Sequence, residues 1–459
     1  MASATTSPDN LSKVFKAYDV RGIVGEQLDE ELARAAGAAY VAVLGIDALV
    51  IGYDMRPSSP ALAGAFADGA TTAGADVTMI GLASTDQLYF ASGHLNLPGA
   101  MFTASHNPAQ YNGIKMCRAL AQPVGAESGL AEIRDRVAAG TPVAASGRSG
   151  SIGEHDVLQA YAAHLLSLAP VSGRRLKVVV DAGNGMAGHT APAVFERLAG
   201  QVEMIPMYFE LDGTFPNHEA NPIEPANLVD LQKRVIAERA DIGLAFDGDA
   251  DRCFLVDERG ELVSPSTLTA LIAARELAKE PGATVIHNLI TSRAVPEIVT
   301  ELGGTPVRTR VGHSYIKATM AETDAVFGGE HSGHFYFRDF WRADSGMLAA
   351  LHALAALAES DRPLSDLLRA YERYPLSGEI NSTVADQDAV LAALEEAYGA
   401  QDGVTIDKLD GLSIGHADWA FNVRASNTEP LLRLNAEGKD EPTMARVRDE
   451  ALAIIRSGK

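Results

Sequence analysis

The sequence is short of cysteine, of positive charge and of long apolar runs. Only two of its 459 residues are cysteines, Cys117 and Cys253, so it carries no disulfide framework, and we expect a protein of the reducing cytoplasm. Asp and Glu outnumber Lys and Arg by 60 to 38. The resulting formal net charge of -22 argues against nonspecific binding to nucleic acid or to an anionic membrane. We therefore expect no nucleic acid and no membrane among its partners.

No segment of the sequence resembles a secretory signal or a transmembrane helix. Residues 1–10 are small and polar, and they lack the basic and apolar regions of a signal. The most apolar helical stretch, residues 346–358, is too short to span a bilayer and contains His352. We predict a buried core helix there.

Length and composition predict a globular protein of several domains. A chain of 459 residues exceeds what one hydrophobic core organises, and 47% hydrophobic with 21% charged residues is typical of folded proteins. Segments beginning at Ala48, Leu176 and Thr284 each run from an apolar strand through a polar loop into an Ala- and Leu-rich helix. We expect one α/β unit used three times, although strand–loop–helix order is also common by chance. Residues 144–153 and 371–378 look like boundaries, and the Pro- and Asn-rich residues 211–225 like a connecting loop.

Residues 101–115 combine several reactive side chains after an apolar run: Ser105, His106, Asn107 and Lys115. A serine hydroxyl needs a base, a metal or a strong electrophile before it reacts at neutral pH. If it carries phosphate it also needs cations, which His106 and Lys115 can supply. Because Ser and Asn-Pro also open ordinary turns, this segment alone is equally consistent with a structural turn.

Three aspartates, Asp247, Asp249 and Asp251, occupy alternate positions after the apolar run 242–246. Carboxylates at this spacing can converge on one hard cation, and oxygen ligands favour magnesium. A solvated acidic turn or a calcium loop is the alternative, but the Glu that completes a calcium loop is missing at the expected offset. Three close carboxylates repel one another unless something neutralises them, so we predict a metal site.

A third chemically suggestive segment lies near the end of the chain, at residues 424–433. Arg424 and Arg433 flank Ser426, Asn427 and Thr428. Two guanidinium groups with hydroxyl and amide donors between them suit a phosphate group. A capped helix start is the alternative, although a helix N-terminus would itself favour an anion.

In this order, residues 103–108, 247–252, 329–334 and 424–433 resemble four loops of the α-D-phosphohexomutases. The resemblance covers nearly the whole chain, and residues 17–22 and 311–317 also match family segments. It implies an α/β fold of four domains around a central cleft: three similar mixed-sheet α/β domains and a smaller, different α+β C-terminal domain. We place the phosphoserine-loop, metal-binding, sugar-binding and phosphate-binding domains at residues 1–150, 151–255, 256–372 and 373–459.

The resemblance also implies roles for the matching residues. Ser105 would be phosphorylated at rest and, with Asp247, Asp249 and Asp251, would hold Mg²⁺. Hexose 1,6-bisphosphate would be both intermediate and activator, and would turn around in the cleft. The implied residues at the reacting end are Ser105, His106, Lys115, Arg21 and His334, with the identity of the acid/base left open. The implied substrate-binding residues are Tyr18, Arg252, His313, Glu330, Ser332, Arg424, Ser426, Asn427, Thr428 and Arg433.

The loop sequences also suggest a substrate. Gly-Glu-His-Ser-Gly-His at 329–334 and Arg-Ala-Ser-Asn-Thr-Glu-Pro at 424–430 are more similar to phosphomannomutases and bifunctional phosphomannomutase/phosphoglucomutases than to phosphoglucosamine mutases. We expect interconversion of mannose 6-phosphate and mannose 1-phosphate, and leave open whether the glucose phosphates are also substrates. We expect a cytoplasmic protein that is a monomer or a homodimer. Some bifunctional relatives carry a lysine in the segment where this chain has Asn-Leu-Ile at 288–290. If that lysine helps them accept glucose phosphates, its absence here favours mannose as the substrate sugar. The alternatives are a phosphoglucosamine mutase and a non-catalytic phosphosugar-binding protein.

Overall fold

The computed structural model describes residues 5–140, 149–425 and 431–457, without the side chains of residues 313 and 314. The chain forms two compact units. Unit 1 comprises Met1–Ser264 and Ser332–Leu367, and unit 2 comprises Pro265–His331 and Leu368–Lys459. Within the described ranges, every helix is too short or too polar to cross a membrane.

Unit 1 begins with a seven-stranded mixed sheet. Its strands are β1 (Val20–Ile23), β2 (Ala48–Tyr53), β3 (Asp76–Leu82), β4 (Gly99–Phe102), β5 (Tyr111–Arg118), β6 (Gln122–Pro123) and β7 (Ile152–Glu154). They are ordered β1-β5-β4-β2-β3-β7, with β6 paired to β5. The trio β3-β2-β4 is parallel, whereas β5 is antiparallel to both β4 and β1. Since β7 pairs with β3, the chain leaves this sheet only after Glu154; of the predicted boundary at 144–153, residues 144–148 lie outside the described part.

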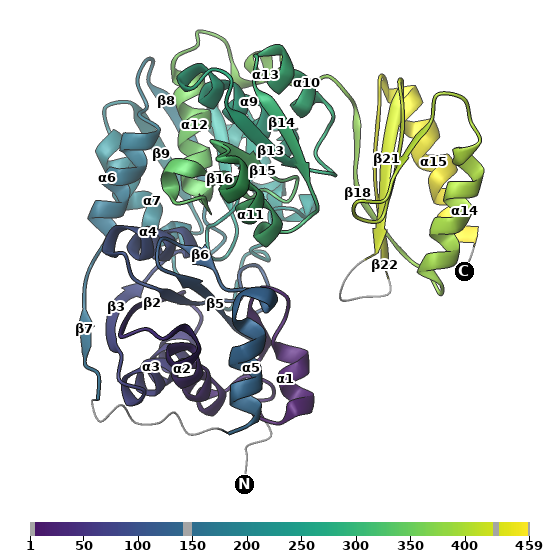
Figure 1. Cartoon of the computed structure of the whole chain (residues 1–459). Helices are drawn as coiled ribbons and strands as arrows, with labels where there is room; N and C mark the ends of the chain where they lie inside the picture. The colour runs from purple at the N-terminus through teal and green to yellow at the C-terminus, as the bar shows by residue number, and fades with distance from the viewer. Residues whose placement is uncertain (1–4, 141–148, 426–430, 458–459) are drawn as a thin grey trace. The chain divides into compact units, whose positions relative to one another are not determined.

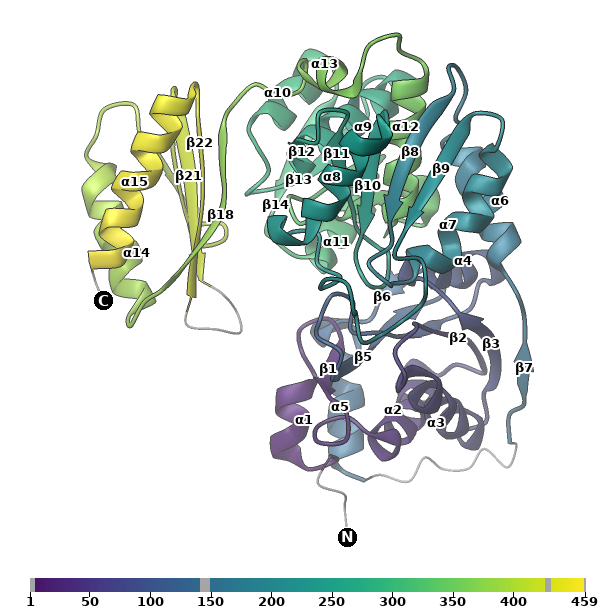
Figure 2. The ribbon, with the colours of Figure 1, turned by 180° about the vertical axis from the view of Figure 1, so that it is seen from behind.

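Helices cover both faces of this sheet, which explains why β2 and β4 are buried along most of their length. The helices are α1 (Pro8–Val14), α2 (Glu30–Leu44), α3 (Ser59–Thr72), α4 (Thr85–Leu95), η1 (Ala126–Ser128) and α5 (Leu130–Ala138). As Figures 1 and 2 show, α2 and α3 lie on one face and α4 on the other. The pair α2–α3 packs so closely that a Cβ atom on Gly69 would lie 1.9 Å from the Arg34 carbonyl oxygen, so only glycine fits there.

The second sheet of unit 1 repeats the same design. Its strands are β8 (Leu176–Asp181), β9 (Val202–Met207), β10 (Ile242–Phe246), β11 (Cys253–Asp257) and β12 (Leu262–Val263). They are ordered β12-β11-β10-β8-β9, with a parallel trio β9-β8-β10 followed by antiparallel β11. The accompanying helices are α6 (Leu158–Leu168), α7 (Ala187–Phe195), η2 (Glu196–Leu198), η3 (Pro225–Leu228) and α8 (Val229–Glu238). Residues 208–224 form neither helix nor strand, as their Pro and Asn content predicts.

The last part of unit 1 is a short hairpin followed by helices. Its elements are β16 (Phe335–Phe337), η4 (Arg338–Phe340), β17 (Ala343–Asp344), α12 (Gly346–Ala358) and α13 (Leu364–Leu368). The side chain of Ser345 caps α12 by accepting from the Leu348 amide. All but one residue of α12 are buried, which confirms the predicted core helix.

Unit 2 contains the third parallel trio and a differently built sheet. The trio is β14 (Thr305–Thr309), β13 (Thr284–Asn288) and β15 (Phe327–Gly329), with helices α9 (Pro265–Lys279), α10 (Ala294–Glu301) and α11 (His313–Thr323). The second sheet comprises β18 (Leu376–Thr383), β19 (Thr405–Asp407), β20 (Leu412–His416), β21 (Trp419–Ala425) and β22 (Leu431–Gly438), with α14 (Gln387–Gly399) and α15 (Glu441–Ser457). It is antiparallel throughout, in the order β18-β22-β21-β20-β19.

The C-terminal sheet has one apolar and one polar face. Both α14 and α15 lie on the same face (Figures 1 and 2). Along β21, Phe421 and Val423 belong to the apolar core, while Asn422 and Arg424 alternate with them and point to the other face. The predicted fold class is confirmed in its parts: α/β units of one recurring design, and an antiparallel C-terminal sheet with helices.

Candidate active site

The loop between β4 and β5, residues 103–110, is here called the serine loop. Ser105 is 2% exposed and adopts a left-handed backbone conformation, with φ of 50°. Its amide donates to Thr103 Oγ1 at 2.9 Å, and its hydroxyl donates to Asp247 Oδ2 at 2.8 Å. His106 Nδ1 lies 3.2 Å from the same hydroxyl, and burial with two nearby arginines lowers the pKa of His106 well below its usual value. The serine hydroxyl therefore points at a carboxylate beside a neutral imidazole.

The acidic loop, residues 247–252, connects β10 to β11 and brings the three predicted carboxylates together. Asp247, Asp249 and Asp251 are buried, and each offers an oxygen within 4.8 Å of the others. Lys115, on β5, donates to Asp249 at 2.7 Å and to Asp251 at 2.6 Å. Ser105, Lys115 and the acidic triplet thus form one cluster within unit 1.

The acidic loop has the features of a site for a hard cation. The Oδ1 atoms of Asp249 and Asp251 are buried, and neither accepts a hydrogen bond. Buried carboxylate oxygens normally accept a hydrogen bond. Two such oxygens that accept none indicate a place for a further positively charged ligand. Three carboxylates and a serine oxygen are also the ligand types that Mg²⁺ prefers. These residues fit the predicted magnesium ion.

The close approach of these groups shifts their pKa values. Burial and the neighbouring Asp251 and Asp249 raise the pKa of Asp247 to about 8. Burial opposes the ionisation of Asp249, but the Lys115 ammonium and its hydrogen bond hold the pKa of that carboxyl well below its usual range. Burial likewise opposes the charge on Lys115, yet Asp249 and Asp251 raise its pKa well above the ordinary value. Three carboxylates this close repel one another, and a divalent cation would stabilise all three in the ionised form.

Arg252 and His334 lie against the acidic loop. The Arg252 amide donates to Asp247 Oδ1 at 3.2 Å, and its Nε lies 3.5 Å from Asp247 Oδ2. His334 Nδ1 lies 3.1 Å from Asp344 and 3.7 Å from Asp251. Burial and Arg252 oppose protonation of His334, but the two carboxylates outweigh them and raise its pKa. An imidazole with a raised pKa therefore adjoins the acidic loop.

Arg21 and Tyr18 lie next to the serine loop. Arg21, on β1, donates to Asn107 Oδ1 at 2.6 Å, to the Ala104 carbonyl at 3.3 Å and to Asp19 at 2.6 Å. Tyr18 is half-buried just before β1. Arg21 thus braces the serine loop and is not simply an exposed strand end.

In unit 2, Glu330 follows β15 and is buried. Its Oε1 accepts from Asn288 Nδ2 at 3.2 Å and from the Gly312 amide at 3.1 Å. The next residue, His331, has its Nδ1 3.4 Å from Ser266 Oγ. Ser332 belongs to unit 1 and is half-buried.

Arg424 and Arg433 are directly paired across β21 and β22. Both donate to one carboxylate on β18, Glu379, at 3.3 and 3.1 Å. The Nε atoms of both arginines are buried without a hydrogen bond. Two guanidinium groups thus share a single acidic partner. Of the other predicted substrate ligands, four lie outside the described residues or side chains: His313, Ser426, Asn427 and Thr428.

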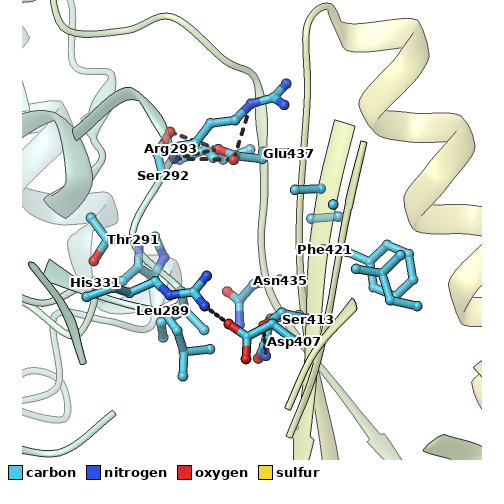
Figure 3. Close-up of a pocket in the computed structure, with 18 of the residues that line it drawn as sticks. Leu289, Thr291, Ser292, Arg293, His331, Asp407, Ser413, Phe421, Asn435 and Glu437 are labelled. Carbon is cyan, nitrogen blue, oxygen red and sulfur yellow. Dashed lines mark hydrogen bonds and ion pairs between the residues drawn. The ribbon is translucent and has the colours of Figure 1, made fainter. Parts of the chain in front are cut away.

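Unit 2 also contains a partly open cavity of about 220 Å³ beside the loop that carries His331. Figure 3 shows one wall formed by Ser292 and the other residues of the β13–α10 loop, and the opposite wall by the polar face of the C-terminal sheet. Glu437 joins the two walls, because it accepts from Ser292 Oγ at 2.8 Å and from the Arg293 amide at 3.2 Å. Burial raises the pKa of Glu437. An ion pair between Arg308 and Asp407 also links the walls.

Three residues near the reactive cluster were not predicted from the sequence. Arg56 is fully buried and donates to the Ser105 carbonyl at 2.9 Å. Thr85, the first residue of α4, donates to Asp249 at 2.5 Å, and Asp344 contacts His334. The segment Asp-Met-Arg at 54–56 follows the carboxyl end of β2, where α/β sheets place ligand-binding loops, and this position was the available signal for Arg56.

Comparison with known proteins places the whole chain. Models of phosphoglucomutase/phosphomannomutase α/β/α domains I, II and III match residues 12–143, 159–260 and 264–374, and the model of the C-terminal domain matches residues 379–454. A phosphomannomutase of Salmonella montevideo is 42% identical over 451 residues, covering 96% of this chain and 99% of that protein. The chain belongs to the phosphoglucomutase/phosphomannomutase family. The predicted relationship to phosphohexomutases is confirmed.

Other members of the phosphoglucomutase/phosphomannomutase family are similar over the same length. A protein named phosphohexose mutases from Xanthomonas campestris pv. campestris is 41% identical over 447 residues, covering 97% of this chain and 99% of that one. The crystal structure of a phosphoglucomutase/phosphomannomutase family protein from Burkholderia thailandensis matches with a TM-score of 0.88 at 33% identity, covering 100% of this chain and 98% of that one. The likeness therefore spans all four domain types of the family.

Proposed function

We propose that this protein is a phosphohexomutase that interconverts mannose 6-phosphate and mannose 1-phosphate through a phosphorylated Ser105. The observation that carries the proposal is the 2.8 Å hydrogen bond from Ser105 Oγ to Asp247, the first of three buried carboxylates. A serine that holds a phosphoryl group next to a metal site is what this transfer requires. The phosphomannomutase of Salmonella montevideo, similar over nearly the whole chain, supports mannose as the sugar.

Ser105, Asp247, Asp249 and Asp251 would hold Mg²⁺. When bound, the ion would neutralise charge on the phosphoryl group as it moves. The buried oxygens of Asp249 and Asp251 that accept no hydrogen bond support this assignment. Lys115 would hold these carboxylates in place and offer a proton or a positive charge to the transferred group.

The reaction would take place as two successive phosphoryl transfers. In the first, the bond between Ser105 Oγ and phosphorus breaks, and a bond forms from the sugar 1-hydroxyl oxygen to phosphorus. This gives the 1,6-bisphosphate, and the hydroxyl proton passes to a base of the site. After the bisphosphate turns around, the bond between its 6-oxygen and phosphorus breaks, and Ser105 Oγ bonds to that phosphorus. The proton returns from the base to the 6-oxygen, which gives mannose 1-phosphate. Lys115, His106, His334, Arg252 and Arg21 are the groups near the reacting end.

We assign sugar and phosphate binding to the remaining predicted residues. Glu330 would accept hydrogen bonds from sugar hydroxyls. Its carboxylate is buried and already accepts two hydrogen bonds, from Asn288 and from the Gly312 amide, which supports a fixed position for it. Arg424 and Arg433 would bind the phosphate group that is not reacting. That phosphate would take the place of Glu379, the carboxylate to which both arginines now donate. The further assigned ligands are Tyr18, His313, Ser332, Ser426, Asn427 and Thr428.

The cellular setting and the domain limits are also proposals. A cytoplasmic location suits the two cysteines, Cys117 and Cys253, which are both buried and form no disulfide. We retain a monomer or homodimer, and domain limits at residues 1–150, 151–255, 256–372 and 373–459.

A coupled assay tests the proposal directly. Mannose 1-phosphate, glucose 1-phosphate and glucosamine 1-phosphate are compared in the presence of Mg²⁺ and a trace of hexose 1,6-bisphosphate. We expect turnover of mannose 1-phosphate, and the response to glucose 1-phosphate then defines how broad the specificity is. Faster turnover of the glucosamine compound would assign a phosphoglucosamine mutase. Folded protein without activity on all three would contradict the mutase assignment.

A further inference from the structure

One buried arginine outside the predicted site organises the backbone of the serine loop. The Arg56 side chain is 0% exposed. Its guanidinium donates to four main-chain carbonyls, at 2.9 Å to Ser105, 2.6 Å to Asn107, 2.9 Å to Pro108 and 2.9 Å to Tyr111. Both terminal nitrogens thus contact the serine loop or the first residue of β5.

The opposite side of the guanidinium is also fixed. Its Nε lies 3.3 Å from Asp54 Oδ2, and the Asp54 side chain is equally buried. Asp54 Oδ1 accepts from the Arg56 amide at 3.0 Å and from Ser59 Oγ at 2.5 Å. The Phe215 ring centroid lies 5.1 Å from Arg56 Cζ. The Arg56 guanidinium is therefore held in one position, because a buried charge is stable only where its partners surround it.

Arg56 and the acidic loop hold the Ser105 carbonyl from two sides. A Cβ atom on Gly248 would come 2.4 Å from the Ser105 carbonyl oxygen, so the acidic loop packs directly against that peptide. Arg56 donates to the same oxygen. The left-handed conformation of Ser105, which is unfavourable for a non-glycine residue, is thereby held in place with its hydroxyl next to Asp247.

We propose that Arg56 is a positioning residue for the phosphoryl transfers, because it fixes the Ser105 backbone and so sets the serine oxygen against the acidic loop. It acts through the main chain and contacts no reacting atom. The inference rests on the proposed mutase function. Lysine cannot replace it, since one ammonium with three donors cannot span four carbonyls that a planar fork reaches.

The test compares Arg56→Lys with Arg174→Lys. Arg174 is a suitable control because it also pairs with an aspartate, Asp241, and donates to a carbonyl, that of Ser360, away from the serine loop. We expect kcat for mannose 1-phosphate to fall about tenfold or more in the first variant, with KM within about threefold. Phosphorylation of Ser105 by hexose 1,6-bisphosphate, followed by intact mass, slows in parallel. The control keeps wild-type rates.

A purely structural role would reduce the amount of folded enzyme without slowing each folded molecule. Folded Arg56→Lys protein with wild-type kcat would therefore overturn the inference. If that variant does not fold, Gly213→Ala displaces the same residue, because the added Cβ would lie 2.7 Å from Arg56 Cα and 3.2 Å from its Cγ. We expect the same loss of kcat at constant KM, and unchanged kcat would overturn the inference.

Amide hydrogen exchange separates this inference from the proposed function. In Arg56→Lys, or in Gly213→Ala if the lysine variant does not fold, exchange of the serine loop should become faster than in wild type, whereas Arg174→Lys should match wild type. This readout needs no turnover. If the wild-type protein proves inactive on every hexose phosphate, the mutase proposal fails, but faster loop exchange would still support Arg56 as the residue that positions Ser105. Unchanged exchange would contradict that role.

Discussion

The serine and acidic loops of unit 1 and the paired arginines of unit 2 hold their charges in different ways. Lys115 is bound between two buried aspartates, and Ser105 is fixed through its hydroxyl, its amide and its carbonyl. Arg424 and Arg433 instead share Glu379, whose side chain is 28% exposed. The proposed reacting end is therefore preorganised, whereas the proposed phosphate-binding end has a partner that water can reach.

This difference matches what each end would have to do. Transfer of a phosphoryl group depends on charges already in place before the reaction, and groups bound on several sides meet that need. A phosphate-binding end must accept and release its anion in two substrate orientations, so an exchangeable partner is suitable there. The predictions below test this contrast.

Ser105→Ala should have the largest effect. Without the oxygen that carries phosphate, we expect kcat to fall by about 10³-fold or more, because the residual rate comes only from binding and electrostatics. The side chain is small, so thermal unfolding should stay close to wild type. The coupled assay and circular dichroism measure the two effects. Ordinary turnover by the folded variant would exclude the phosphoserine role.

Asp249→Asn should weaken metal dependence and rate together. The substitution removes one charge of the acidic triplet and weakens the hydrogen bond that Asp249 accepts from Lys115. We expect the Mg²⁺ concentration for half-maximal activity to rise about tenfold to a hundredfold. Asp241→Asn is a matched control, because Asp241 pairs with Arg174 away from the acidic loop. A metal titration identical to wild type would remove Asp249 from the site.

Asp86→Asn should change the pH dependence of stability. Burial raises the pKa of Asp86 to about 6, although Ser345, Ser84 and Tyr161 donate hydrogen bonds to it. The folded form therefore takes up a proton more readily than the unfolded one. The free energy of unfolding should gain roughly 2 to 3 kcal/mol from this group as pH falls from about 7 to about 4.

The asparagine variant should lose that gain, because an amide does not titrate and its hydroxyl partners can also accept hydrogen bonds. Urea unfolding of wild type and variant between pH 4.5 and 7.5 measures the difference. Asp68→Asn is the control, since Asp68 is exposed and pairs with Arg34 on the surface. Parallel pH profiles for wild type and Asp86→Asn would show that Asp86 is ionised throughout.

The sequence predicted those parts of the site whose members are close along the chain. Ser105 with His106, and the alternating Asp247, Asp249 and Asp251, can be recognised within a few residues. The role of Arg56 depends on a carbonyl 49 residues away, to which the arginine donates only after β2 and β4 pair side by side. A single arginine after a strand is more often a surface residue, so local pattern alone could not assign it.

The fold shows the same limit. Matched strand–loop–helix order predicted the recurring α/β unit, because each parallel trio is built from consecutive segments. The order β18-β22-β21-β20-β19 joins the first strand of the C-terminal sheet to the last, and no local signal encodes that pairing. Glu379 meets both arginines only because of it: on β18, Glu379 and Asn381 pair with Asn435 and Arg433 of β22. Its role was therefore invisible in the sequence.

Glu379→Gln should have the smallest effect and bears most directly on the contrast between the two ends. If Glu379 only occupies the arginines until phosphate arrives, removing its charge should lower KM for mannose 1-phosphate about fivefold, with kcat within about twofold. Ion pairs that water can reach contribute about 1 kcal/mol or less, which sets this scale and predicts little loss of stability. A rise in KM would instead show that Glu379 orients both guanidinium groups for phosphate. The end in unit 2 would then be as preorganised as the serine loop, and the contrast between the two regions would not hold.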